Sequence, residues 1–222
     1  DYLEEYFESE VIKAHMAGSA IIGTALGPYS PGSAYVLLHH YMGEVDGNVG
    51  AWGYARGGMG SITQAMSKSL IANGGNIKAG SAVKNILVKN NRSYGLALEN
   101  GDEIYADKIV SNLDVKRTFL KVVEKKELPS EFYTAVKNFK IRGSSGKLNI
   151  ALDDKPIWKS IPKDDPASTG DLHFTQSIEE MEGAYDDWKD GKWSSLPYVD
   201  MCIPTLNDPT MAPQGKHYMS VF

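Results

Sequence analysis

The chain has 222 residues, 42% of them apolar and 23% charged, so it can fill one large or two small hydrophobic cores. The net charge is −5, with Lys and Arg scattered, which argues against a nucleic-acid partner. No apolar run is long enough to cross a bilayer. The single cysteine, Cys202, excludes an internal disulfide and is predicted to be a buried, unreactive strand residue.

The first 60 residues predict two helices followed by loops. Leu3, Phe7 and Val11 recur every four residues, which predicts a helix over 2–17 with a short continuation through Ile21 and Ile22. A second helix is predicted over 34–42. Many glycines then alternate with aromatic residues and histidines up to residue 60, a pattern typical of loops that bring the backbone close to another group.

A third helix is predicted after Gly57-Gly58-Met59-Gly60. Ser61 and Gln64 have the spacing of a capping box, and Asn73-Gly74-Gly75 is a typical helix end. The glycine run before this helix has two interpretations that the sequence leaves open: a helix start that binds an anion, or a tight turn.

Residues 77–112 predict β-structure. A short strand is expected at Ile77, and a three-stranded meander over 83–89, 94–98 and 103–106. Asn90 to Ser93 should turn the chain, and Asn100-Gly101 predicts a hairpin in which both residues have positive φ. The run Lys108-Ile109-Val110-Ser111-Asn112 predicts a short buried strand.

The second half alternates helices, loops and strands. Asp114 and Pro129 are expected to begin two helices, and Ser177 with Glu180 to cap a third that ends at Gly191. Strands are predicted over 148–152, 173–177, 198–203 and 217–222, and a loop over 153–171. Because the chain starts without Met and ends within a strand, we expect it to be a piece of a longer protein.

Few residues by themselves carry a recognisable chemistry. The sequence has no Gly-x-Gly-x-x-Gly, no phosphate-binding Walker loop and no nucleophile motif. Adjacent His39 and His40 should point to different sides of their element, so no metal site is expected. The aromatic and methionine side chains could line an apolar cavity or fill an ordinary core, and both alternatives stay open.

Two longer stretches resemble a known family. The first runs from Gly57-Gly58-Met59-Gly60 through Asn73-Gly74-Gly75-Asn76-Ile77 to Ala106-Asp107-Lys108-Ile109-Val110-Ser111-Asn112. The second begins at Cys202-Ile203-Pro204-Thr205-Leu206-Asn207-Asp208-Pro209 and continues to His217. Their order and spacing resemble the flavin-dependent amine oxidase superfamily, in particular its phytoene dehydrogenase-like branch, which includes the pyridine nucleotide-disulphide oxidoreductase domain-containing proteins.

The resemblance implies an α/β (α+β) fold with a partial FAD/NAD(P)-binding domain, a three-stranded meander and a mixed α+β substrate domain. It assigns residues 1–56 to substrate-domain helices and a glycine-rich loop, 57–113 to the middle of the FAD-binding domain, and 114–222 to the substrate domain, truncated at its end. The glycine fingerprint and ribose-binding acid of such proteins have no counterpart in the sequence. FAD is therefore expected in the intact parent but not bound tightly to this chain.

The resemblance also suggests positions for the ligands. Val83 is expected to meet the adenine through its backbone, and Gly57, Gly58 and Met59 to lie near the flavin or the substrate. The substrate side is assigned to His39, His40, Tyr41 and Trp52. No residue is identified as a catalytic acid or base.

The predicted function is an FAD-dependent oxidoreductase that takes hydride from an apolar substrate, with the isolated chain inactive. The alternative is a lipid- or protein-binding module of the same fold without redox chemistry. Peripheral membrane contact and self-association remain open, no nucleic-acid partner is expected, and the compartment would be cytoplasmic or mitochondrial. The substrate and the electron acceptor are not specified by the sequence.

Overall fold

The computed structural model describes residues 2–162 and 165–222, and it divides into two compact units. Unit 1 contains the chain up to Met66 and again from Arg142 to Phe222, and unit 2 contains Ser67–Ile141. Helices and antiparallel sheets give the mixed α+β fold that was predicted. None of the helices in the described part of the chain is long and apolar enough to cross a membrane.

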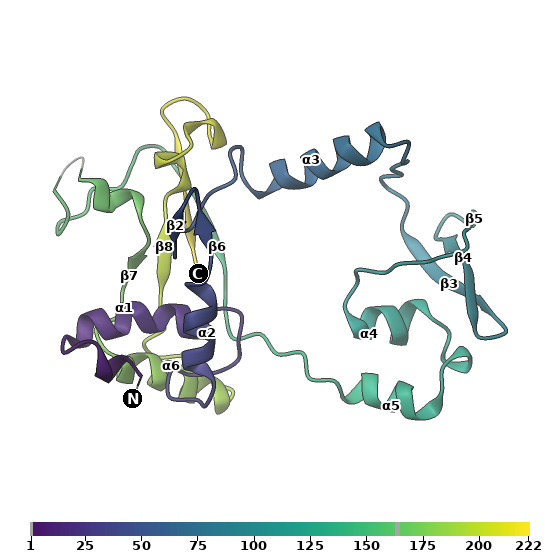
Figure 1. The fold of residues 1–222 in the computed structure, drawn as a ribbon, viewed down its shortest axis with the longest axis horizontal. Helices are drawn as coiled ribbons and strands as arrows, with labels where there is room; N and C mark the ends of the chain where they lie inside the picture. The colour runs from purple at the N-terminus through teal and green to yellow at the C-terminus, as the bar shows by residue number, and fades with distance from the viewer. Residues whose placement is uncertain (1, 163–164) are drawn as a thin grey trace. The chain divides into compact units, whose positions relative to one another are not determined.

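Unit 1 combines helices with a four-stranded sheet and a small hairpin (Figure 1). The antiparallel sheet has the order β6-β9-β8-β7, and β1 pairs with β2. The helices are α1 (Glu10–Ile21), α2 (Ser33–His40) and α6 (Ile178–Lys189), and the strands are β1 (Glu44–Val45), β2 (Asn48–Val49), β6 (Leu148–Leu152), β7 (Leu172–His173), β8 (Asp200–Cys202) and β9 (His217–Val221).

The core of unit 1 lies among α1, α2 and α6. Ala17 and Ala20 of α1 pack with Leu37 of α2 and Met181 of α6, and all four are buried. Small side chains on α1 let the neighbouring helices approach closely, while apolar side chains of α2 and α6 fill the space between them. Two further buried residues are Met201, in the middle of β8, and Ile203, directly after the strand.

Unit 2 consists of the meander and two short helical segments. Helix α3 (Met59–Ala72) begins in unit 1 and ends in unit 2. It leads into the strands of the antiparallel sheet, in the order β3-β4-β5. The remaining elements are β3 (Val83–Lys89), β4 (Arg92–Leu98), β5 (Glu103–Tyr105), α4 (Val115–Arg117), which continues as a π-helical turn over Thr118–Val122, and α5 (Ser130–Asn138).

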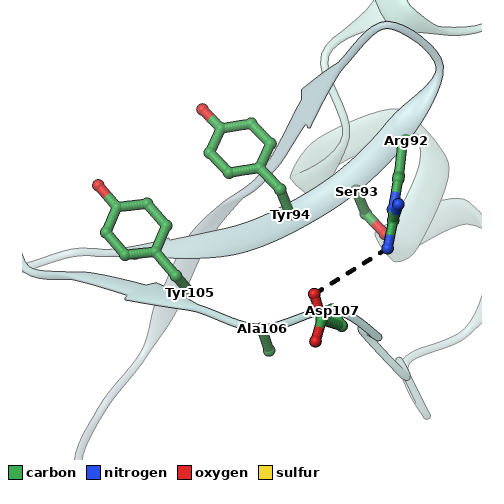
Figure 2. A pocket seen from close by; sticks show the side chains of 6 residues that line it. All are labelled: Arg92, Ser93, Tyr94, Tyr105, Ala106 and Asp107. Atoms are coloured by element: carbon green, nitrogen blue, oxygen red, sulfur yellow. Dashed lines mark ion pairs between the residues drawn. The ribbon is translucent and has the colours of Figure 1, made fainter.

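The open side of the meander carries a shallow pocket of about 480 Å³ (Figure 2). The rings of Tyr94 and Tyr105 stack with centroids 6.1 Å apart, and Arg92 lies 4.0 Å from the Asp107 carboxylate. Tyr105 is 64% exposed, and Arg92 and Asp107 are largely exposed as well. These side chains therefore cover a surface rather than enclose a ligand.

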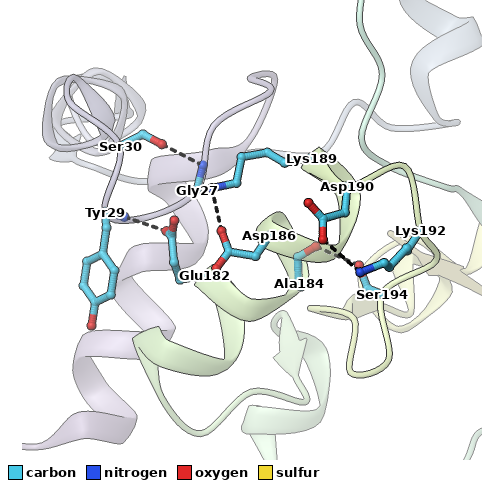
Figure 3. Close-up of polar contacts among 10 residues, drawn as sticks. All are labelled: Gly27, Tyr29, Ser30, Glu182, Ala184, Asp186, Lys189, Asp190, Lys192 and Ser194. Atoms are coloured by element: carbon cyan, nitrogen blue, oxygen red, sulfur yellow. Dashed lines mark hydrogen bonds and ion pairs between the residues drawn. The ribbon is translucent and has the colours of Figure 1, made fainter.

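The loop before α2 is fixed to α6 by polar contacts (Figure 3). Figure 3 shows the backbone N–H of Tyr29 donating to Glu182, 3.0 Å away. The Tyr29 hydroxyl also donates to Glu179 at 2.7 Å. A Cβ at Gly27 would lie 2.4 Å from the Glu182 carboxylate, so this close approach requires glycine. At the other end of α6, the Ser194 hydroxyl donates to the Ala184 carbonyl.

Several predicted elements are confirmed. Helix α2 and strands β3, β4, β6 and β9 lie within about a residue or two of the predicted ranges. Asp114 accepts the Arg117 N–H at 2.9 Å, and the Ser177 hydroxyl accepts the Glu180 N–H at 3.2 Å, so both predicted caps are present. Helix α3 ends in a turn where Gly74 has φ +82°.

The predicted helix over 2–17 is wrong in its length. A short 3₁₀ turn covers Leu3–Glu5, and α1 starts only at Glu10 and continues to Ile21. The four-residue spacing of Leu3 and Phe7 is instead used by a turn, because the Phe7 N–H bonds to the Leu3 carbonyl. Ser61 is not a helix cap either, since α3 begins at Met59 and the Ser61 hydroxyl donates back to Gly58.

The turn with two positive φ angles, predicted at Asn100-Gly101, is found instead at Asn90-Asn91. Asn90 and Asn91 both have positive φ, at 52° and 59°, and connect β3 to β4 in the tight form predicted for Asn100-Gly101. In the second turn only Gly101 has positive φ, at 92°, and the Asn100 side chain contacts Asp102. Asn therefore takes the left-handed conformation at two adjacent positions here.

Three predicted strands are absent or shortened. Ile77 and residues 108–112 are not in strands, and Val110 is 93% exposed. No neighbouring strand pairs with these residues in the described part of the chain, and an unpaired extended segment is not a strand. The strand predicted over 173–177 is reduced to Leu172–His173, because Ser177 already caps α6.

The compact units also differ from the predicted domain limits. Residues 114–141 belong to the same compact unit as the meander, whereas the prediction assigned them to the substrate domain. This geometric division does not say which unit would face a flavin. The assignment of 1–56, 57–113 and 114–222 to flavin and substrate domains stays a prediction.

Gly95 of β4 offers a test of the meander. An added Cβ would lie 2.7 Å from the Ile104 carbonyl oxygen of β5, so Gly95→Ala must push the strands apart. We expect a loss of about 1–3 kcal/mol in the free energy of unfolding of unit 2, measured by urea titration. Lys84→Ala, at an exposed position of the neighbouring strand β3, is the control in the same unit and should cost little. Equal effects of both substitutions would contradict the packing described for β4 and β5.

Candidate functional site

The polar side chains of unit 1 gather on one face of its sheet, around β7 and β8. Asp200 and Cys202 alternate with buried Met201, so they lie on the face opposite to it. Strand β7 pairs Leu172 with Met201 and His173 with Asp200, which brings His173 to the same face. Carboxyl, imidazole and thiol groups thus share one surface, and none of them was selected from the sequence as a site residue.

A histidine and a tyrosine form the most enclosed part of this face. The Tyr198 hydroxyl and His173 Nδ1 share a short hydrogen bond, and the His15 ring of α1 packs edge-on against His173 with centroids 4.6 Å apart. Burial lowers the pKa of His173, with a smaller effect from His15. Burial also raises the pKa of Tyr198. Near neutral pH both groups are therefore uncharged.

Two carboxylates stand beside this pair. Burial raises the pKa of Asp200 from 3.8 to about 6, and the negative charge of Asp171 adds to the shift. Neither carboxylate has an ion pair recorded within the described ranges 2–162 and 165–222. Asp200 is therefore poised to hold or release a proton near neutral pH, which is the property required of an acid or base.

Cys202 lies beside Tyr54 at the other end of the face. Burial raises the pKa of the Cys202 thiol, although contact with Tyr54 lowers it slightly, and burial likewise raises the pKa of Tyr54. The thiol form dominates, which agrees with the predicted lack of reactivity. Cys202 is half-buried, however, so it is less buried than predicted.

The Gly57-Gly58 turn binds an anion that belongs to the chain itself. The Gly57 N–H donates to the Asp208 carboxylate at 2.6 Å, and the same carboxylate accepts the hydroxyl and the N–H of Thr210. These hydrogen bonds, led by that from Gly57, lower the pKa of Asp208. Gly58 leaves room for Met211, whose methyl carbon would lie 2.9 Å from an added Cβ.

The geometry thus combines the two interpretations that the sequence left open: a tight turn with two positive φ angles, and an anion on its backbone. Because Asp208 occupies the Gly57 N–H, that donor is not free for a phosphate. Met59, the third predicted residue, is 76% exposed at the start of α3.

The structure brings together three of the four residues assigned to the substrate side. His39 and His40 are adjacent in α2, and the His40 ring stacks on Trp52 with centroids 5.8 Å apart. Trp52 is 63% exposed. Tyr41 turns away from this group, because its hydroxyl contacts the Met16 sulfur at 3.9 Å and its ring packs on the helical core. Whether any of them binds a substrate stays a prediction.

Val83 lies in unit 2, at the free edge of the meander. The Ala82 carbonyl accepts the Glu99 N–H at 2.9 Å, so that carbonyl points toward β4. The chain has no cis peptide bond among the described residues, so the Val83 N–H points the opposite way, to the open edge of β3. A backbone donor at a free strand edge fits the expected contact with an adenine ring.

The residues present therefore fit only part of an FAD molecule. Val83 suits the adenine, whereas the Gly57-Gly58 turn does not suit the pyrophosphate because Asp208 already occupies its donor. No group of three or more possible metal ligands occurs within residues 2–162 and 165–222.

Sequence patterns missed the sheet face because its members are dispersed. His173, Tyr198 and Asp200 come from separate strands or strand ends, and His15 comes from a helix. The only local signal was the alternation of residues 198–203, which predicted a strand but not its neighbours. The link from Asp208 to Gly57 was also missed, although both stand in the quoted family motifs.

Comparison with known proteins places the chain among flavoproteins. The family model described as flavin containing amine oxidoreductase matches residues 3–220. The rat pyridine nucleotide-disulfide oxidoreductase domain-containing protein 2 (Rattus norvegicus) is 34% identical over 99% of this chain and 39% of its own length. The chain thus spans about two fifths of that relative.

Two carotenoid enzymes and one protein of known crystal structure are also similar to this chain. The chloroplastic prolycopene isomerase of Daucus carota is 30% identical over 84% of this chain and 28% of its own length. The zeta-carotene-forming phytoene desaturase of Myxococcus xanthus is 24% identical over 99% and 38%. The crystal structure of an oxidoreductase from Methanosarcina mazei has the same fold, with a TM-score of 0.59, 18% identity, and coverage of 96% of this chain and 46% of that one.

Asp208 provides the first test of this site. In Asp208→Ala, we expect hydrogen exchange of the Gly57 amide to accelerate about tenfold because its charged acceptor is gone. Asp165→Ala is a matched control, since Asp165 also caps a short turn, by accepting the Ala167 N–H, but is not the acceptor of the Gly57 N–H. Unchanged exchange at Gly57 would contradict the proposed link.

The same variant should show a defined pH dependence. Because the pKa of Asp208 is lower in the folded state, its stabilising effect is fully present above the unfolded value of 3.8. It is lost as the pH falls through the lower folded pKa. Thermal unfolding of wild type and Asp208→Ala should therefore differ at neutral pH and converge in strong acid.

The contribution of Asp200 to stability should change with pH in the opposite direction to that of Asp208. Its pKa is raised to about 6, so the folded state binds a proton more tightly than the unfolded state, and stability falls as the pH rises from 3.8 to about 6. Asp200→Asn should remove this penalty and stabilise the chain at pH 7 by about 1–2 kcal/mol, allowing for solvent screening. Urea unfolding below pH 3.8 should show no such gain. A loss of stability at pH 7 would contradict the burial of an unpaired carboxylate.

Proposed function

The chain belongs to the flavin containing amine oxidoreductase family, and from that premise we propose that it serves an FAD-dependent oxidoreductase which removes hydride from an apolar substrate. The observation that carries the proposal is the family match over residues 3–220. When bound, FAD supplies the hydride acceptor, and the protein contributes orientation and electrostatics.

The residues of this chain have two proposed tasks. Val83 offers its outward N–H to the adenine at the edge of β3. The exposed aromatic group around His40 and Trp52 provides an apolar surface for the substrate, together with Tyr35 and Met42, which are more than 70% exposed. Large exposed apolar side chains in one segment are typical of a surface that binds an apolar molecule.

The apolar nature of the substrate is supported by charge as well as by exposure. Between Lys13 and Arg56 the sequence has no Lys or Arg, and its only acids are Glu44 and Asp46. A surface of this composition has few partners to offer a charged substrate. The carotenoid relatives act on apolar polyenes by their names, and this similarity supports the same substrate class here.

The exposed aromatic surface also supports the second candidate, a lipid- or protein-binding module without redox chemistry. Both candidates predict binding of an apolar partner. Only the first predicts a bound flavin, so the flavin decides between them.

The experiment uses the product of the complete gene that encodes these residues. We expect the purified protein to be yellow and to release FAD on denaturation, identified by mass. Val83→Pro removes the outward N–H at an edge position that tolerates proline, so it should lower the FAD content severalfold. Val83→Ala keeps that N–H and should retain FAD.

A folded, colourless protein would contradict the flavoenzyme proposal and favour the binding module. Equal FAD content in Val83→Pro and Val83→Ala would leave the enzyme intact as a proposal but would exclude the Val83 contact. The 222-residue chain alone should bind FAD only weakly, because it has no Gly-x-Gly-x-x-Gly segment to bind the pyrophosphate.

A further inference from the structure

A second cavity, which belongs to unit 1, lies between α1 and β7 and measures about 320 Å³. Val11, Ile12 and His15 line it from α1, and Asp171, His173 and Thr175 line it from β7 and its flanks. Its volume is near the lower end of the range of roughly 300–1,000 Å³ for small-molecule sites. A short ligand, rather than a long polyene, matches this space.

The wall of the cavity is built around a helix glycine. An added Cβ at Gly18 would lie 2.3 Å from the Tyr198 hydroxyl and 3.4 Å from the His173 ring. The missing side chain lets the Tyr198–His173 pair come under α1, where His15 packs on it. The imidazole that faces the cavity is thus held by contacts from a helix and from a strand end.

The charge inside the cavity has one sign. Asp171, which is exposed to solvent, is the only carboxylate among the described lining residues, and no Lys or Arg occurs among them. His173 is kept uncharged by burial, so it does not oppose a cation. The facing groups on the adjacent β8 side are Tyr198, which is neutral, and Asp200, which can only add negative charge.

The remaining surface of the cavity is apolar. Val11 and Ile12 are 60% and 47% exposed on α1, and Leu172 of β7 is also among the lining residues. A carboxylate with imidazole rings at one side and aliphatic side chains at the other suits a molecule with one cationic head and a short aliphatic tail.

We propose that the cavity between α1 and β7 binds a small primary alkylammonium ion, with the ammonium group paired to Asp171 and the alkyl chain against Val11 and Ile12. The proposal rests on unit 1 alone. It requires neither a flavin nor oxidation of the ligand, so its failure would leave the proposed oxidoreductase function untouched.

The experiment is a titration of the ¹⁵N-labelled 222-residue chain, followed by NMR. The probe is n-butylammonium chloride, compared at equal ionic strength with n-butanol and sodium butyrate. We expect saturable shifts of the Ile12, Leu172 and Thr175 amides with n-butylammonium only, at a dissociation constant on the order of millimolar. The neutral and anionic probes keep the tail but lose the ammonium group.

Two variants separate the cavity from general attraction to a negative protein. Asp171→Asn should weaken n-butylammonium binding about fivefold or more, because it removes the paired charge. Asp153→Asn should bind as wild type does, since Asp153 is exposed, pairs with Lys216 and does not line the cavity. Unchanged amide spectra away from the cavity show that each variant is folded.

Three outcomes would overturn the proposal. The first is the absence of saturable shifts up to the solubility limit of the probe. The second is an equal response to n-butanol, which would mean that the apolar wall alone binds. The third is an equal loss in Asp171→Asn and Asp153→Asn, which would mean that only the net charge of the chain matters.

Discussion

The hydrogen bond from Gly57 to the Asp208 carboxylate joins segments that lie 151 residues apart in the chain. It fixes the turn before α3, and it does so with the backbone donor that a phosphate would otherwise use. The same carboxylate also caps the short turn at Thr210, so one side chain holds two loops of unit 1. This contact therefore holds the turn from which α3 starts.

The sheet of unit 1 adds a second constraint, which is electrostatic. Asp171, His173, Tyr198 and Asp200 share one face, and burial shifts the pKa of the last three toward their uncharged forms. The sheet thereby places Asp200, whose pKa is raised to about 6, together with an uncharged imidazole and an uncharged phenol near a cavity with aliphatic walls. Such a combination of perturbed titration and concave shape is more typical of a binding or catalytic site than of a purely structural sheet.

The larger pocket of the meander has no comparable support. Its volume of about 480 Å³ exceeds that of the α1–β7 cavity, but its titratable side chains are all exposed, whereas His173 of that cavity is half-buried, and its one ion pair spans 4.0 Å. Exposed ion pairs of this length contribute little and do not organise a site. The clearest contribution of unit 2 is instead the outward N–H of Val83, a donor at the free edge of β3.

The sequence by itself determined the local structure wherever neighbouring residues decide it. The alternation in 148–152 and 217–222, the caps at Asp114 and Ser177, and the family motifs all depend on nearby positions, and these predictions are confirmed. Only the tertiary structure decided whether Val110 lies in a paired strand and which of the two asparagine-containing turns has two positive φ angles. It also decided which side chains lie together on the sheet. Pairing, burial and pKa depend on residues that are distant in sequence, so the physical cause of the candidate site does not exist until the chain folds.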